Sequence, residues 1–217
     1  MSSPAPLTTT SYAVLGLLAI GPATGYELAK QMERSLRVVW PRAESRLYEE
    51  PRKLVAHGLA QGETEQGGRR TTRYSITPSG RQALHEWLSQ PSAPPDLEFE
   101  GLLKVFYADH GDRDALIATL NEVIEEARSR LAIGDALARE YLAGPGHYPD
   151  RIHVNALVWE YLRRHHRTIL DWAAWAADIV RGWETSEVTP AKQAAALDIF
   201  RAGTATADAV DGDPASK

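Results

Sequence analysis

The first 90 residues divide into segments in the order helix, helix, helix, hairpin, helix, and this order restricts the fold more than any other feature of the chain. The apolar run 12–20 predicts a first helix, capped by Thr10 or Ser11. The dipeptide Gly21-Pro22 ends it. The sequence from Thr24 to Glu27 is a capping box, which opens a second helix that runs to about Leu36.

A third helix is expected from about Arg42 to His57, where Gly58 stops it. One side of this helix is apolar and the other carries basic and polar residues, as expected for a helix that packs on a core. Pro51 lies inside the predicted span. Because proline lacks an amide donor, we expect it to bend the helix there.

A hairpin and a fourth helix complete this part of the chain. Two short strands, 59–65 and 71–76, flank a glycine- and arginine-rich turn at residues 66–70. Thr77 is placed to cap the fourth helix, with Pro78 at its first position. The succession predicts a winged helix-turn-helix, in which the hairpin is the wing.

Basic side chains gather on the third helix and the hairpin. An α-helix fits the DNA major groove, where arginine binds guanine edges or phosphates, and a hairpin tip can reach neighbouring phosphates. An alternative is that these are solvated surface charges, because Glu49 and Glu50 partly neutralise them. Given the order of elements, we predict binding to double-stranded DNA through Arg42, Ser45, Arg46, Tyr48, Arg52, Lys53, Arg69, Arg70 and Arg73.

The charge distribution supports contact with nucleic acid by one part of the chain only. The net charge of the whole protein is −5. Residues 1–90 hold 11 Lys/Arg against 8 Asp/Glu, a net of +3, so residues 91–217 carry −8. A basic first part and an acidic second part fit a protein that touches phosphate with one domain.

Several classes of function are disfavoured by what the sequence lacks. There is no cysteine, no pair of histidines at metal-chelating spacing, and no nucleotide-binding or nucleophile motif. We therefore expect no metal, no cofactor and no enzyme activity. The first residues have no basic leader, and the apolar run 12–20 is too short to cross a bilayer, so a cytoplasmic protein without a membrane span is expected.

The proline-rich stretch 91–96 predicts a linker. Beyond it the pattern is helical, with a short helix at 97–107 and long helices from Asp112 to Gly144 and from about Asp150 to Trp183. A last short helix is expected at 190–201, followed by disorder. The predicted organisation is mainly α: a loose N-terminus (1–8), a winged helix-turn-helix domain (9–90), a linker (91–96), a helical dimerisation domain that could also hold an effector (97–184), and a short helix with a disordered tail (185–217).

The second long helix is apolar around most of its circumference. An apolar arc this wide has to be covered from more than one side, which predicts a homodimer. Its tryptophans and histidines could instead line a pocket for a planar aromatic effector, since rings stack and imidazole binds a carboxylate or phenol. The simpler alternative is a core or dimer seam filled with tryptophan. The candidate effector residues are His153, Trp159, His166, Trp172 and Trp175.

Residues 8–90 resemble the PadR family of transcriptional regulators. The resemblance rests on four stretches in order, which are residues 12–18, 25–28, 47–59 and 69–81. Residues 97–183 are similar, by layout more than by motif, to the helical dimerisation region of the longer members. The resemblance implies a homodimer that binds a pseudo-palindromic operator, and it implies that Tyr48 contacts the DNA backbone. Pro51 departs from the family, which usually has leucine there.

Taken together, the residues and the resemblance predict a homodimeric DNA-binding regulator, expected to be a repressor that a small aromatic molecule releases. The alternative is a protein-interaction module built on a helical dimer. Binding to duplex that weakens with added salt separates the first hypothesis from the second.

Overall fold

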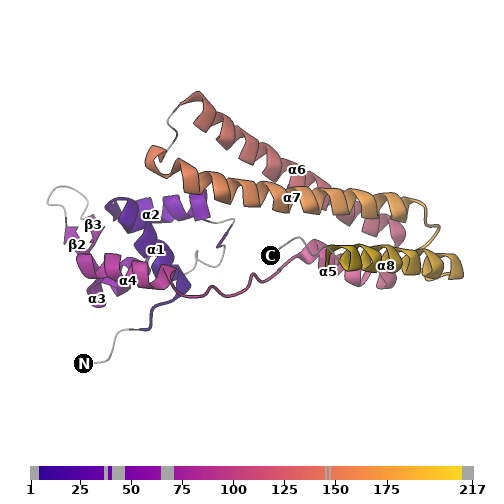
Figure 1. Ribbon diagram of the computed structural model, residues 1–217, viewed down its shortest axis with the longest axis horizontal. Helices are drawn as coiled ribbons and strands as arrows, with labels where there is room; N and C mark the ends of the chain where they lie inside the picture. Colours follow the sequence, from indigo (N-terminus) through magenta and orange to yellow (C-terminus); the bar gives the residue numbers. More distant parts are fainter. Residues whose placement is uncertain are drawn as a thin grey trace. The chain divides into compact units, whose positions relative to one another are not determined.

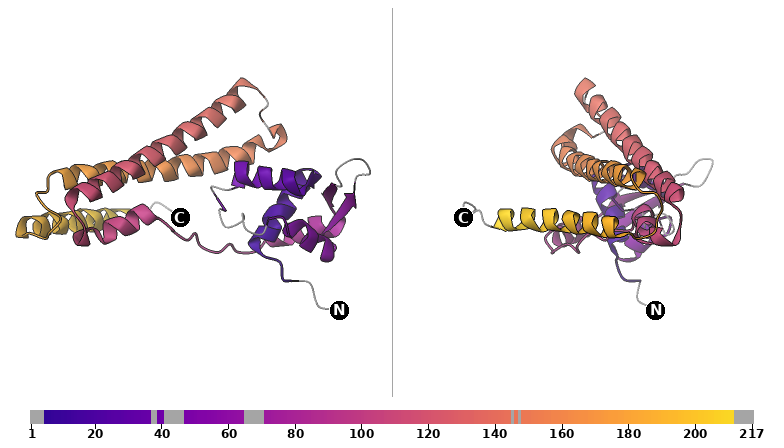
Figure 2. Two further views of the ribbon diagram at one scale, coloured as in Figure 1. Left: turned by 180° about the vertical axis from the view of Figure 1, so that it is seen from behind. Right: turned by 90° about the vertical axis from the view of Figure 1, so that its right-hand side faces the viewer.

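The structure is a computed structural model that describes residues 5–36, 39–40, 47–64, 71–144, 146 and 148–211. The chain forms two compact units, Met1–Pro95 and Asp96–Lys217, which we call unit 1 and unit 2. Figures 1 and 2 show a small mixed unit 1 and a wholly helical unit 2. Within the described part of the chain, no helix is long and apolar enough to cross a membrane.

Helix α1 (Thr9–Ile20) is the central element of unit 1. It begins one turn earlier than the sequence predicted, because the cap is Thr8 and not Thr10 or Ser11. The Thr8 hydroxyl accepts the Ser11 amide, and the Ser11 hydroxyl accepts the Thr8 amide, so the two residues satisfy each other's backbone donors. Four apolar residues of α1 are buried in the core: Val14, Leu15, Leu17 and Leu18.

Helix α2 (Gly25–Gln31) begins at the predicted capping box, in which Thr24 accepts the Glu27 amide and Glu27 accepts the Thr24 amide. It continues as a π-helical turn, η1 (Met32–Leu36). The short strand β1 (Ala23–Thr24) was not foreseen, because two residues carry no periodicity. It pairs antiparallel with β3 and ties the start of α2 to the sheet.

Helix α3 spans Glu50–Ala56, so the prediction of a helix from about Arg42 with an internal proline is wrong at its start. Residues 47–49 form a turn, and residues 41–46 lie outside the described part. Pro51 occupies the first turn of α3, where its missing amide has no intrahelical partner to lose. The proline therefore helps to begin this helix and does not bend it. Gly58, with a φ of 70°, ends it.

Strands β2 (Ala60–Thr64) and β3 (Thr72–Ile76) form the wing, in a three-stranded antiparallel sheet of order β1-β3-β2. Helix α4 (Pro78–Leu88) follows directly, with Thr77 as its cap as predicted. Its first turn lies against the end of α3. A Cβ on Gly80 would stand 2.0 Å from the carbonyl oxygen of Leu59, so only glycine fits there without a shift.

Unit 2 is built on two long helices, α6 (Arg113–Ala143) and α7 (Ile152–Arg181), which cross at an acute angle in Figures 1 and 2. Asp112, which the sequence predicted as the start of this long helix, is the N-cap of α6. A short helix, α5 (Glu100–Phe106), packs against α6 and leads into the 3₁₀ turn η3 (Ala108–His110). A second 3₁₀ turn, η4 (Pro149–Arg151), precedes α7. The buried core of the unit comprises Leu116, Leu120, Ile124, Ala173, Ala177 and Val180.

The last helix, α8, spans Pro190–Asp211 and corrects the prediction of a helix ending near Arg201 with disorder beyond. The residues after Arg201 are alanine-rich, and alanine has the highest helix propensity, so the helix continues through them. Compositional bias had suggested disorder because this stretch has few large apolar residues.

Candidate nucleic-acid interface

The start of α3 presents two of the predicted DNA-contacting side chains to solvent. The Tyr48 side chain, in the turn before the helix, is 66% exposed. Arg52, in the first turn of α3, is also exposed, whereas Pro51 and Leu54 are buried in the core. The buried pair fixes the helix on unit 1, and the N-terminal end of α3 is thereby left open to a partner. In helix-turn-helix proteins this end of the second helix is the one that meets base edges.

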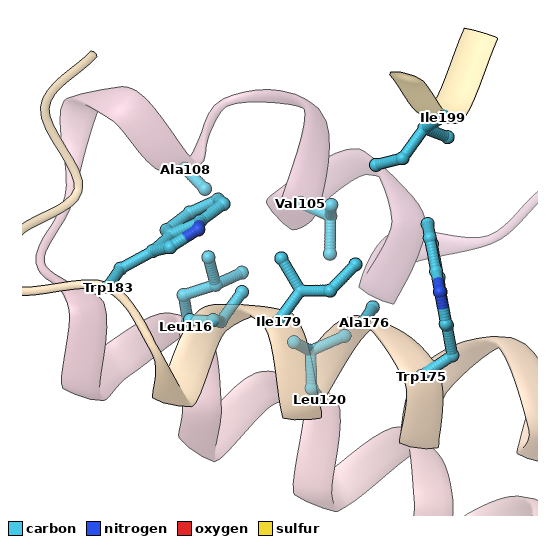
Figure 3. A pocket seen from close by; sticks show the side chains of 10 residues that line it. Val105, Ala108, Leu116, Leu120, Trp175, Ala176, Ile179, Trp183 and Ile199 are labelled. Atoms are coloured by element: carbon cyan, nitrogen blue, oxygen red, sulfur yellow. The ribbon is translucent and has the colours of Figure 1, made fainter. Parts of the chain in front are cut away.

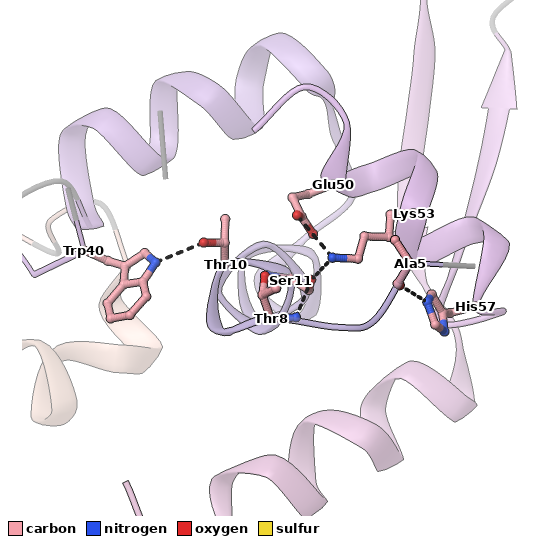
Figure 4. A network of polar contacts seen from close by, with 8 residues as sticks. All are labelled: Ala5, Thr8, Thr10, Ser11, Trp40, Glu50, Lys53 and His57. Atoms are coloured by element: carbon pink, nitrogen blue, oxygen red, sulfur yellow. Dashed lines mark hydrogen bonds and ion pairs between the residues drawn. The ribbon is translucent and has the colours of Figure 1, made fainter. Parts of the chain in front are cut away.

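Lys53 points the other way, into the network drawn in Figure 4. Its ammonium donates to the Ser11 hydroxyl at 3.0 Å and lies 3.5 Å from an oxygen of the Glu50 carboxylate. Its side chain is 16% exposed, and that of Glu50 only 6%. Lys53 was predicted to contact DNA, but its ammonium instead binds within unit 1 and links α3 to the start of α1. No periodicity or motif marks Ser11 as its partner, whereas Glu50 lies three residues before Lys53 on the same helix.

The buried Glu50 carboxylate is only half satisfied. One of its oxygens, Oε2, is buried and has no hydrogen-bond partner among the residues that the structure describes. A buried charge keeps its ionised form at an acceptable cost only when it is paired, so the Lys53 ammonium is the group that makes this position tolerable.

Arg73, predicted at the base of the wing, connects β3 to the start of α2. Its guanidinium donates to the Pro22 carbonyl at 3.2 Å and to the Glu27 carboxylate at 3.3 Å. Hydrogen bonds from the Thr24 backbone amide and hydroxyl, and the charge of Arg73, hold the pKa of Glu27 below its usual value. Arg73 thus braces the wing against the helix-turn-helix, and about 42% of its side chain stays accessible.

The other five predicted DNA-contacting residues lie outside the described residues, so the structure does not place them: Arg42, Ser45, Arg46, Arg69 and Arg70. Within the described part, Tyr48 and Arg52 share the open end of α3, Arg73 is at the sheet, and Lys53 is turned inward.

The five candidate effector residues are not brought together on one pocket. They all belong to α7, and the 22 residues between His153 and Trp175 span about 33 Å of helix, far more than a small ligand can touch. Trp159 donates its indole N–H to the Gly134 carbonyl of α6 at 2.9 Å. Trp172 packs edge-on against Phe99, with ring centroids 5.9 Å apart. Both tryptophans therefore make packing contacts within the chain, as expected from the alternative of a core filled with tryptophan.

His153 and His166 differ in environment. His153 is exposed at the first turn of α7. His166 is half-buried, and burial together with the nearby charges of His165 and Arg130 lowers its pKa. Its neutral imidazole is thus favoured, which suits a half-buried position beside other cationic groups. Trp175 is the only one of the five that lines a cavity described in unit 2.

Comparison with known proteins relates two segments of the chain to protein families. Residues 14–86 match the model described as the transcriptional regulator PadR-like family, and residues 100–181 match the model described as virulence activator alpha C-term. The chain therefore contains a PadR-like transcriptional regulator domain at residues 14–86. The first match covers α1 to α4 with the wing, and the second covers α5 to α7. The first match begins inside α1, and helix α8 lies beyond both matches.

Two relatives illustrate the family. The negative transcriptional regulator PadR of Bacillus subtilis is 27% identical over 124 residues, which are 56% of this chain and 68% of the relative. A crystal structure of that protein with operator DNA has a TM-score of 0.70 at 22% identity, covering 80% of this chain and 99% of the other. One with p-coumaric acid has a TM-score of 0.65 at 23% identity, covering 80% and 99%.

The second relative is the virulence activator AphA of Vibrio cholerae. Its structure has a TM-score of 0.62 at 25% identity, covering 79% of this chain and 98% of the other. The proteins that resemble this chain therefore include a negative regulator and a virulence activator.

Proposed function

We propose that this PadR-like regulator acts as a homodimer that binds a pseudo-palindromic operator in the cytoplasm, and that its role is regulatory and not catalytic. The observation that carries the proposal is the open N-terminal end of α3, where Tyr48 and Arg52 are exposed on a helix that Pro51 and Leu54 anchor in the core. The proposal gives base-edge or phosphate contacts to α3 and to the preceding residues Arg42, Ser45 and Arg46. It gives backbone contacts to the wing residues Arg69 and Arg70.

Binding to duplex DNA from upstream of the protein's own gene tests the interface. Fluorescence anisotropy over a range of salt concentrations measures how many phosphates are neutralised. Arg52→Ala should reduce the slope of log K against log salt by about 2 if each guanidinium of the homodimer binds one phosphate, because two contacts are lost. If it reads a base, affinity should fall by about 1–3 kcal/mol with relaxed specificity at one position.

Arg128→Ala is the matched control, because Arg128 is an exposed arginine of unit 2 that pairs with Glu125 on its own helix. It should leave affinity and salt slope as in the wild type. Duplex binding that ignores salt and sequence in every variant would reject the DNA interface and favour the protein-interaction module.

The homodimer is supported by large apolar side chains left uncovered along α6 and α7. Two i, i+4 pairs form exposed patches, one of Ile133 (62%) with Leu137 (42%), and one of Leu157 (72%) with Tyr161 (60%). Apolar stripes of this kind mark protein interfaces. We expect Leu157→Glu with Tyr161→Glu to give monomers in sedimentation velocity, with helicity preserved in circular dichroism. A dimer of unchanged size would remove this stripe from the interface.

Leu120 and Trp172 are unsuitable for that test, although the sequence suggests them as interface positions on the apolar arcs of the two helices. Leu120 is fully buried in the core of its own unit, and Trp172 packs on that core and on Phe99. Acidic substitutions there would unfold unit 2, and the loss of dimer would say nothing about the interface.

We further propose that the protein is a repressor whose release depends on a small aromatic molecule. Support comes from the name of the Bacillus subtilis relative as a negative regulator and from its structure with p-coumaric acid. A reporter fused to the upstream promoter should become more active when the gene is deleted. The purified protein should release operator duplex when an aromatic effector is added. If the reporter instead loses activity when the gene is deleted, the protein is an activator.

A further inference from the structure

Unit 2 contains a cavity of about 180 Å³ between its helices (Figure 3). Four helices contribute to its walls. Side chains from α5, α6, α7 and α8 face it, among them Val105, Leu116, Leu120, Trp175, Ile179 and Ile199. The cavity lies beside the core of unit 2, and only Trp175 belongs to the candidate effector residues.

The chemistry of the walls selects the ligand. Every side chain that lines the cavity is an aliphatic group or an indole, and none carries a charge. A carboxylate placed there would lose its hydration without gaining a counter-charge, which is strongly unfavourable. An aromatic acid suits these walls less well than a neutral hydrocarbon, which exchanges water for dispersion contacts with the lining side chains.

The volume limits the size of such a ligand. The cavity is partly open to solvent, where Trp175 is 47% and Ile199 is 41% exposed, and its volume is close to that of enclosed apolar cavities of about 150 Å³, which take up benzene or xenon. It therefore suits one aromatic ring with a methyl or similarly small substituent. The two indoles, Trp175 and Trp183, stand at different positions of the wall in Figure 3 and offer flat surfaces to a ring.

Helix α8 forms part of the wall through Ile199. Its start is held at the end of α7, where the Lys192 ammonium lies over the Trp183 ring at 4.8 Å and donates to the Thr185 carbonyl. Other large side chains of α8 are exposed, with Leu197 at 51% and Phe200 at 69%. A molecule in the cavity would contact both Ile199 and α7. It would therefore add to the few contacts that α8 makes with the rest of unit 2.

We propose that this cavity is a binding site for a small, uncharged, apolar molecule with a single ring, and that α8 is the wall that the molecule helps to hold in place. The site is separate from the DNA interface and goes beyond the proposed function. It belongs to unit 2 alone, so its occupancy and the binding of operator DNA are measured independently.

Thermal unfolding of the full-length protein in sealed cuvettes tests the proposal, with toluene as the neutral probe and benzoate as its charged counterpart. Circular dichroism at the helical minimum reports the midpoint. At about ten times its dissociation constant, a ligand that binds only the folded state should raise the midpoint by ~3–6 °C. We expect toluene to do so and benzoate not to.

Two variants locate the site. Ala176→Leu adds three carbons from a residue that lines the cavity and should abolish the toluene effect, while Ala156→Leu makes the same change at an exposed position of α7 and should preserve it. Ile199→Ala removes apolar wall from α8 and should weaken toluene binding about tenfold.

Three outcomes would overturn the proposal. One is a midpoint that toluene leaves unchanged or lowers in the wild type. Another is an equal rise with benzoate, which would mean that the lining does not select against charge. The third is a toluene effect that survives in Ala176→Leu, which would place the binding elsewhere. None of these results bears on whether the protein binds operator DNA.

Discussion

Gly80 offers a test in which the sign of the effect depends on the tertiary structure. Replacing a helical glycine with alanine ordinarily stabilises a protein by up to about 1 kcal/mol, because the unfolded chain loses conformational freedom. In α4, however, the new Cβ would lie 2.0 Å from the Leu59 carbonyl oxygen and 2.8 Å from Ile76 Cγ1. The first of these is a backbone atom, so relief requires the whole first turn of α4 to move.

The cost follows from what that movement breaks. The Thr77 amide donates to the Leu59 carbonyl at 3.0 Å, and the Thr77 hydroxyl donates to the Gly58 carbonyl at 2.8 Å. Each bond contributes about 1 kcal/mol, and overpacking adds about 2 kcal/mol. After the propensity gain of about 1 kcal/mol, Gly80→Ala should destabilise unit 1 by ~3 kcal/mol.

Gly16 is the matched control, because it lies within α1 of the same unit and a Cβ there would meet nothing within 4 Å. Gly16→Ala should be neutral or stabilising. Hydrogen exchange of peptides from residues 9–90 at increasing urea concentration reports unit 1 separately from unit 2. If Gly80→Ala proved as stabilising as Gly16→Ala, the close approach of α4 to the end of α3 would be refuted.

Two further predictions concern charged groups. Lys53→Met leaves the buried Glu50 carboxylate without its counter-charge and should destabilise unit 1 by about 3 kcal/mol in urea unfolding. Adding Glu50→Gln should recover most of this loss. An unchanged unfolding midpoint in Lys53→Met would show that the pair does not stabilise unit 1. His166 has a pKa below its ordinary value in the folded protein, first because it is buried and then because His165 and Arg130 repel its proton, so the unfolded chain binds more protons. The free energy of unfolding should therefore be highest above about pH 6.5 and should decline as the pH falls below that value. In thermal melts between about pH 7.5 and 5.5, His166→Gln should show a smaller decline than the wild type. Equal declines in the two proteins would exclude His166 as a contributor.

The elements that the sequence specified well are those with strong local signals. The capping box at Thr24, the Thr77-Pro78 start of α4 and the start of α6 at Asp112 lie where the sequence predicted them. A cap is a contact between residues three apart, so its chemistry is legible from the order of residues. The long apolar patterns of α6 and α7 are similarly local, because the helical period repeats over many turns.

The start of α3 could not be read in this way. Pro51 is compatible with a bend inside a long helix and with the first turn of a short one, and local preference does not choose between them. What decides is burial: the ring of Pro51 and the side chain of Leu54 lie in the core. The inward turn of Lys53 is also a tertiary result, because its partner Ser11 is 42 residues away.

By itself, the sequence determined the order of the helices and the wing, the helix caps and the resemblance to a regulator family, since each depends on neighbours along the chain or on a pattern of residue types. Only the tertiary structure decided which charged side chains are exposed and which make contacts inside the protein. It also decided that the tryptophans of α7 have different environments. The Trp159 indole donates to the Gly134 carbonyl, whereas Trp175 lines a cavity that Ile199 also lines. Such assignments depend on which distant segments meet, and no local rule for residue spacing encodes that meeting.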